Sequence, residues 1–318
     1  VIDRAEVEVN LKDVLFGNQL RIKGITLVNP QITVKVLADG RANYDITYPS
    51  DDAAPAAEEE PGSFSFGIDH WEIIDGELIY DDATIPFYTS IRGLNHSGSG
   101  NFNEKEFDLN TKTSADSVTV QFDGTEYLTN KRATIDAIIG ISEEYTRYTF
   151  KDNLTKLNDF ALSAGGWFKM NEADYAMDIQ FSSPENTFKS LLSLVPGVYT
   201  QDFGKIETKG DLAFAGFVKG TFSDTQMPAF NMNLKVNDAM FKYPDLPTAI
   251  SNINMDLLVD NKTGVIENTL IDLKTMHLDF GSNPVDATLL IENLKDYRVD
   301  GRVKASLNLA ELGKMFPM

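Results

Sequence analysis

The chain has 318 residues, of which 48 are acidic and 28 basic, so its net charge is −20 with three neutral histidines. This balance argues against nucleic acid as a partner, because phosphate backbones are bound by clustered Lys and Arg. Cysteine is absent, which excludes disulfides, thiolate metal sites and cysteine nucleophiles. No apolar run approaches the roughly 20 residues that a membrane-spanning helix needs.

Residues 1–48 form an N-terminal strand unit. Apolar and polar residues alternate from Val7 to Leu11 and from Ile32 to Val36, which is the period of a half-buried strand. Residues 49–63 follow as an acidic segment rich in Ala, Pro and Glu, without periodicity. Such a composition predicts a linker or long loop that separates the first unit from the rest.

The remaining chain predicts two β units, 64–200 and 201–318. Alternation is strictest from Phe230 to Asn237, and turn pairs such as Asp75-Gly76 separate the apolar strings at short intervals. These features predict a mostly β protein in which successive strands are antiparallel neighbours in a long, twisted meander. We expect each unit to be closed by a short amphipathic helix, near 184–195 after Ser183-Pro184 and near 309–316.

An internal repeat supports this division. Asp75 to Asp82, followed by Ile91-Arg92-Gly93-Leu94-Asn95, resembles Asn237 to Asp245, followed by Ile250-Ser251-Asn252-Ile253-Asn254. The order of the elements is the same in both copies. We interpret them as related runs of antiparallel strands that extend a sheet.

Candidates for chemistry are weak. The histidines His70, His96 and His277 lie far apart in the sequence, and none belongs to a nucleophile or metal motif. The pairs Asp81-Asp82 and Glu143-Glu144 lack the spacing of a calcium loop. The sequence therefore predicts no catalytic residue, metal site or cofactor, and a protein that is not an enzyme.

Several segments resemble the AsmA family of bacterial envelope proteins. The first runs from Val7 to Gly17, the second from Leu20 through Ile22-Lys23-Gly24-Ile25 and Asn29-Pro30 to Ile32, and the third from Asp39-Gly40 to Asn43-Tyr44. The block from Asp238 to Asp256, with Tyr243-Pro244-Asp245-Leu246-Pro247 and Ile253-Asn254, resembles the family's C-terminal region. The segments lie at opposite ends of the chain and in the family's order.

The resemblance implies a function. AsmA-like proteins are similar in architecture to TamB-like and chorein-type bridge-like lipid transfer proteins, whose twisted sheets curl into an apolar-lined groove. It implies a periplasmic body anchored in the inner membrane of Gram-negative bacteria, phospholipid or other acyl-chain ligands, possible outer-membrane partners, and a role in lipid transport and outer-membrane lipid homeostasis. The chain begins at Val1 and shows no anchor, which we interpret as an excised or processed piece.

The apolar rows supply the candidate residues of the groove. They are Phe214, Val218, Phe222, Phe230, Met232, Leu234, Val236, Ile253, Met255, Leu257, Leu278, Phe280, Leu289, Ile291, Val303 and Leu307. Their facing stays open, because Ile271 and Leu273 are out of phase with Met276 and a single bulge would reverse the assignment. Two alternatives also stay open. One is an assembly factor with a closed β-sandwich core, and the other is a carbohydrate-binding module, which the isolated positions of Trp71 and Trp167 disfavour.

Overall fold

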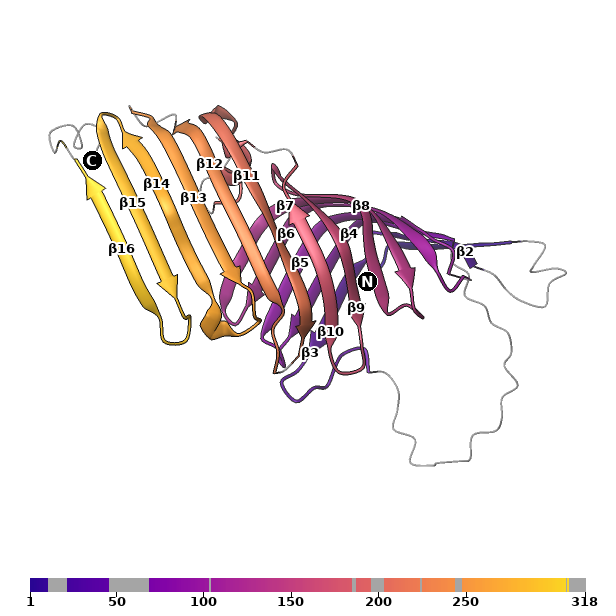
Figure 1. The fold of residues 1–318 in the computed structure, drawn as a ribbon. Coiled ribbons are helices and arrows are strands. Elements are labelled where there is room, and N and C mark those ends of the chain that lie inside the picture. Colours follow the sequence, from indigo (N-terminus) through magenta and orange to yellow (C-terminus); the bar gives the residue numbers. More distant parts are fainter. Residues whose placement is uncertain are drawn as a thin grey trace. The chain divides into compact units, whose positions relative to one another are not determined.

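The computed structural model describes residues 1–10, 22–45, 69–102, 104–184, 187–195, 203–223, 225–243, 248–306 and 308. It is almost entirely β, with 71% strand and 4% helix, which confirms the predicted class of a mostly β protein built on open antiparallel sheet (Figure 1). The chain divides into two compact units, Val1–Tyr145 and Thr146–Met318. The 200/201 boundary between the two β units stays a prediction from the repeat.

Unit 1 contains seven described strands. They are β1 (Arg4–Val9), β2 (Ile22–Val28), β3 (Gln31–Val36), β4 (His70–Asp82), β5 (Phe87–Ser99), β6 (Phe107–Phe122) and β7 (Thr125–Ser142). From β4 to β7 each strand pairs antiparallel with the next, as the alternation and the turn residues predict.

The meander prediction is wrong at the start of unit 1. β2 and β3 both pair with β4 in parallel, β2 along its first half and β3 along its second half. Together they form one strand that is broken at Asn29-Pro30, where Asn29 adopts a left-handed φ of 49°. The N–H of Asn29 donates to the carbonyl of Ile74, and the N–H of Glu77 donates to that of Pro30, so the ladder continues across the break. Residues 37–69 then provide the long connection that a parallel neighbour requires.

Unit 2 contains nine described strands. They are β8 (Arg147–Leu157), β9 (Phe160–Met170), β10 (Tyr175–Ser182), β11 (Glu207–Phe222), β12 (Ala229–Lys242), β13 (Ile250–Asn261), β14 (Leu270–Phe280), β15 (Asn283–Glu292) and β16 (Arg298–Ala305). All pair antiparallel with their neighbours in chain order, and β11 to β16 can be followed side by side in Figure 1. The short helices are α2 (Phe188–Leu192), η1 (Phe203–Lys205) and η2 (Ile266–Asn268).

Helix α2 lies within the predicted closing segment but begins later than the Ser-Pro signal indicates. Its N-cap is Thr187, whose side-chain oxygen accepts a hydrogen bond from the Ser190 N–H. Thr187 also bridges to Asp211 at the start of β11, so the sheet rather than Pro184 determines where the helix begins. The second predicted helix, 309–316, and the linker 49–63 lie outside the described residues.

The internal repeat corresponds to a recurring structure, which we call the paired bulge. Two adjacent strands each carry one extra residue, on opposite sides of one facing pair. The facing pair is Gly76 and Leu94 in β4–β5, and Ala239 and Ile253 in β12–β13, with the same register offsets on either side. The sequence comparison missed a third copy in β6–β7, where Val118 faces Lys131.

The same side chains stabilise the two copies that the sequence reveals. The amide oxygen of Asn254 accepts from the Asp238 N–H at 3.1 Å, and its amide nitrogen donates to the Asn252 carbonyl at 3.0 Å. Asn95 makes the equivalent bonds with Asp75 and Gly93, at 3.1 and 3.3 Å. Asp238 and Asn252 have left-handed φ angles of 43° and 51°, which Asn, Asp and Gly tolerate best. Because these positions favour Asn, Asp and Gly, the repeat can be recognised in the sequence.

We predict that Asn254→Ala destabilises unit 2 by about 1 kcal/mol, because it removes both hydrogen bonds of an exposed bulge. Urea unfolding measures the change as a lower midpoint with an unchanged slope. Asn110→Ala is the matched control, since Asn110 lies exposed in a regular part of β6. Equal midpoints for the two variants would contradict a structural role of Asn254.

Candidate functional site

The strand register assembles one apolar face on unit 2. Residues that face each other across an antiparallel ladder lie on the same side of the sheet. Leu234 faces Phe214 on β11 and Leu257 on β13, and Leu257 in turn faces Leu273 on β14. Following such pairs from β9 to β16 links apolar side chains from eight successive strands. We call this surface the apolar face.

Fifteen of the sixteen groove candidates lie on the apolar face. The sixteenth, Leu307, lies outside the described residues. The register adds apolar residues that were not among the groove candidates. These are Phe168, Met170, Tyr175, Met177, Ile179, Phe181, Val259, Ile271, Leu273, Met276, Val285, Ala287 and Val299.

A bulge in β14 determines whether Ile271 and Leu273 lie on the same face as Met276. Leu273 faces Leu289 and Met276 faces Ala287, so three positions of β14 match two of β15. The extra residue lies at Lys274-Thr275, and it returns Met276, Leu278 and Phe280 to the face that carries Ile271 and Leu273. Both rows therefore belong to the apolar face.

One end of the apolar face is covered from within the chain. Phe188 and Leu192 of α2, with Phe203 and Ile206, pack against Leu212 and form a buried cluster with Val236, Ala239 and Ile253. Asn158, in the turn after β8, donates to the Ser193 carbonyl at 2.8 Å, and the Asp159 N–H donates to the Ser193 hydroxyl at 3.2 Å. These hydrogen bonds hold the C-terminal end of α2 against the turn after β8, so this part of the apolar face is a closed core.

The rest of the apolar face is more open. Tyr175 stacks on Phe168 with ring centroids 5.6 Å apart, and on Phe222 at 6.5 Å. Met170 is 37% exposed, Phe222 48% and Val303 74%. Within unit 2, no second described sheet covers these side chains. The fold thus leaves apolar area in contact with solvent.

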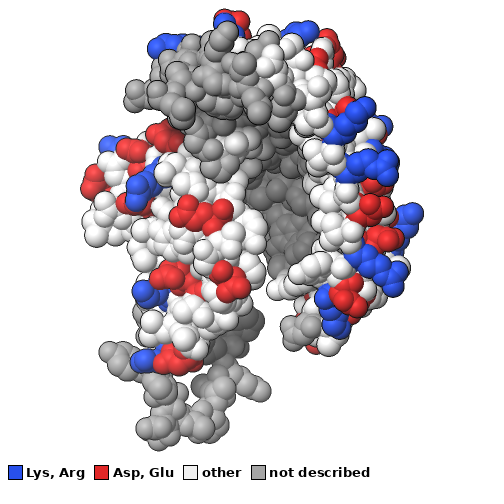
Figure 2. Space-filling view, turned by 90° about the vertical axis from the view of Figure 1, so that its left-hand side faces the viewer, with Lys and Arg blue, Asp and Glu red and all other residues white. Residues whose placement is uncertain are grey.

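The opposite face of unit 2 is polar and held by cross-strand pairs. Lys219 forms an ion pair with Asp178 at 2.7 Å and Lys235 with Asp256 at 3.2 Å, while Asn231 donates to Asp260 at 2.8 Å. Charged groups of both signs are interleaved on the surface seen in Figure 2.

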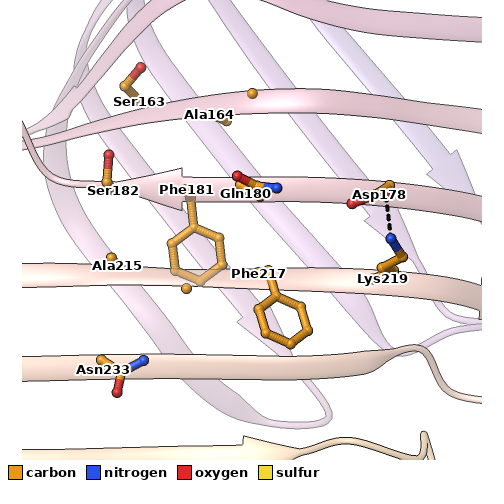
Figure 3. A pocket seen from close by; sticks show the side chains of 12 residues that line it. Ser163, Ala164, Asp178, Gln180, Phe181, Ser182, Ala215, Phe217, Lys219 and Asn233 are labelled. Atoms are coloured by element: carbon orange, nitrogen blue, oxygen red, sulfur yellow. Dashed lines mark ion pairs between the residues drawn. The ribbon is translucent and has the colours of Figure 1, made fainter.

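A shallow depression of about 710 Å³ lies over strands β9 to β12. By register, most of its lining belongs to the polar face, including Gln180 and Asn233, and small residues such as Ala215 form its floor. Figure 3 shows the Asp178–Lys219 ion pair at one end, with Ser163 and Ser182 toward the other. The depression lies mainly on the polar side of the sheet, and Phe181 and Phe217 also line it.

Unit 1 also has a mainly apolar face, but it includes polar groups. Trp71 faces Gly98 there, and Ile91 faces both Leu78 and Val118. His96 shares this face, with its Nδ1 2.9 Å from the Thr113 hydroxyl, and Lys131 occupies the place that Leu94 and Ile253 hold in the other paired bulges. Burial lowers the pKa of both His96 and Lys131. Periodicity alone does not reveal these exceptions, because each is one polar residue within an otherwise apolar row.

The lowered pKa of His96 predicts a pH-dependent stability of unit 1. Because the folded state disfavours the charged ring, the unfolded state binds the proton at higher pH, and stability falls as the pH drops below the ordinary His value of about 6.5. We expect the Tm of His96→Gln to fall less than that of the parent chain when the pH is lowered from about 7.5 to about 5. Thermal unfolding measures this difference. His70→Gln, on the polar face, controls for removal of an imidazole, and a profile for His96→Gln identical to the parent's would contradict the assignment.

The other candidates for chemistry are not brought together. His277 lies beside Asp279 and Asp286 on the polar face of unit 2, whereas Asp82 accepts hydrogen bonds from Tyr80 and Thr84 in unit 1. Glu143 and Glu144 lie in a turn with left-handed φ angles. Among the described residues, no group of three or more His, Asp or Glu side chains is placed to hold a metal ion.

None of the described helices is both long and apolar enough to span a membrane. The fold and the register define an open-sheet β protein with one apolar and one polar face per unit. Comparison with known proteins does not extend this description, since no family model, curated protein or solved structure matches the chain.

Proposed function

We propose that the apolar face of unit 2 binds the acyl chains of phospholipids or similar lipids. The observation that carries the proposal is the register, which gathers the apolar residues of eight successive strands on one side of an open sheet. An extended hydrocarbon chain needs a continuous apolar strip of this kind, whereas a compact ligand needs an enclosed pocket. Each CH₂ group removed from water contributes about 0.8 kcal/mol.

The side chains of the face suit such a ligand. Met232, Met255, Met276 and Met177 come from four strands, and Met is flexible enough to follow chains of different shape. Away from α2 the register also places Asn261 on this face, but its side chain is fully buried and donates to the Thr269 hydroxyl, so it offers no exposed position for a head group. Many equivalent weak contacts would let a chain slide along the face while its head group stays in water.

In the cell, this binding would support lipid transport and outer-membrane lipid homeostasis, with the body in the periplasm and an anchor in the inner membrane. This part of the proposal rests on the resemblance to AsmA-like proteins. It includes no catalytic step. The polar face, with its alternating ion pairs, is where outer-membrane partners would make contact.

The test is gentle purification of the chain from bacterial membranes, followed by native mass spectrometry and organic extraction. We expect phospholipid in near-stoichiometric amounts. A folded protein that is lipid-free, and stays so after incubation with phosphatidylethanolamine–phosphatidylglycerol vesicles, would contradict lipid binding and favour an assembly factor. Bound oligosaccharide without lipid would favour a carbohydrate-binding module.

A further inference from the structure

Two edge strands of the described sheets are exposed along their whole length. β16 pairs only with β15 among the described strands, and β1 only with β2. All residues of both strands are exposed, including Val303 at 74% and Val7 at 57%. Such edges carry unpaired backbone groups and tend to recruit another strand.

The hydrogen bonds show which backbone groups point outward. The Ser306 N–H donates to the Pro284 carbonyl at 3.1 Å, so by alternation the free edge of β16 carries the backbone groups of Val299, Gly301, Val303 and Ala305. In β1, Val1 exchanges two bonds with Gln31 at 3.0 and 2.7 Å. The same alternation leaves the backbone groups of Arg4, Glu6 and Glu8 on its free edge.

This difference selects a parallel pairing between the two edges. In an antiparallel ladder, outward residues face outward residues, which would place the apolar row of β16 beside the charged row of β1. In a parallel ladder, a residue whose backbone N–H and C=O point toward the partner strand faces a residue whose N–H and C=O point away from it. Gly301, Val303 and Ala305 then lie beside Ala5, Val7 and Val9, and the charged residues lie beside one another on the other face.

The charges select one register. With Asp300 beside Arg4, Arg302 meets Glu6 and Lys304 meets Glu8, so all three neighbours are of opposite sign. A shift by two residues in either direction places Arg4 beside Arg298 or Arg302. Opposite charges directly across a ladder stabilise the pairing, and like charges oppose it. Neither Arg302 nor Lys304 forms an ion pair with another described residue. On β1, Glu6 pairs with Arg4 at 3.0 Å and Glu8 lies 3.7 Å from His70, and both carboxylates are exposed enough to contact a second copy as well.

We propose that β16 of one copy of this chain pairs in parallel with β1 of a second copy, in the register that sets Arg302 beside Glu6. Pairing β16 with itself about a two-fold axis is less complementary, because the register that matches Asp300 with Arg302 also sets Arg298 against Lys304. A β16–β1 contact is heterologous, so copies add head to tail, as a closed ring or an open filament. It also joins the apolar row of one copy to that of the next.

Charge reversal tests the proposal in the full chain. We expect sedimentation velocity to show concentration-dependent association that weakens with salt. Arg302→Glu with Lys304→Glu, and separately Glu6→Arg with Glu8→Lys, should each weaken association by at least about tenfold, since like charges then meet at both positions. A mixture of the two variants should associate again, because every junction in an alternating assembly is complementary.

The register has its own test, since the chain contains no cysteine. Oxidation of a mixture of Val7→Cys and Val303→Cys variants should link the two chains, and Val7→Cys with Val299→Cys should not. A monomer at all concentrations, or association that reversal of the β16 charges leaves unchanged, would overturn the proposal; the latter result would point to β1–β1 pairing. Lipid binding is measured independently on the same variants, so either proposal can fail alone.

Discussion

Met232→Asp should leave the protein folded but reduce co-purifying phospholipid by at least about tenfold, because a carboxylate on an apolar surface must stay hydrated where a lipid chain would lie. Met232 lies near the middle of the apolar face, between Gly216 and Val259. Leu257→Asp, one strand away, should act in the same way. The measurement is the lipid-to-protein ratio by native mass spectrometry.

The neighbouring residue provides the control. Asn233 lies on the same strand but on the polar face, so Asn233→Asp introduces the same carboxylate where it is hydrated. Equal lipid loss in both variants would show that charge, rather than the apolar face, governs binding. Unfolding of Met232→Asp and Leu257→Asp alike would mean that these residues form an ordinary core.

Val236→Asp should behave differently, although it lies on the same strand and the same face. Val236 is 1% exposed under α2, within the cluster that includes Phe188 and Leu212. Burying an unpaired carboxylate there should cost roughly 4 kcal/mol or more and detach the helix. Thermal unfolding should show a large drop in Tm, and limited proteolysis should cut near α2.

Asn237→Asp is the matched control for this variant, because Asn237 is the next residue and is exposed on the polar face. Because Asn237 faces Asp211, the added charge should lower the Tm slightly, and far less than Val236→Asp does. A small effect of Val236→Asp on the Tm would contradict the interpretation that the covered end of the apolar face is a closed core. The solvent-exposed part of the apolar face would then extend as far as α2.

Alternation in the sequence predicted strands and which residues within one strand share a face. A half-buried strand shows its period of two directly, so Phe230, Met232, Leu234 and Val236 could be assigned to one face from the sequence. What it could not determine was how neighbouring strands align. The facing of Ile271 relative to Met276 depends on the bulge at Lys274-Thr275, and no single-strand pattern contains the register of its partner.

The errors arise where distant parts of the chain decide local structure. The order of β2 and β3 beside β4 depends on contacts across residues 37–69, which local turn residues do not encode. The start of α2 depends on Asp211, far along the chain from Thr187. Lys131 was missed as a polar residue of the apolar face of unit 1, because its facing follows from the paired bulge of β6–β7. The sequence signal for that bulge was Asn130, a residue type that tolerates the left-handed φ of 48° found there.

The parallel attachment of β2 and β3 also bears on how the protein folds. From β4 onward every strand of unit 1 pairs with the next along the chain, so those contacts close short loops and can form early. β2 and β3 must instead wait for the segment 37–69 to close, which costs more chain entropy. During synthesis β2 and β3 leave the ribosome before β4, so the edges that they share with β4 would stay unpaired, and open to aggregation, until β4 has formed.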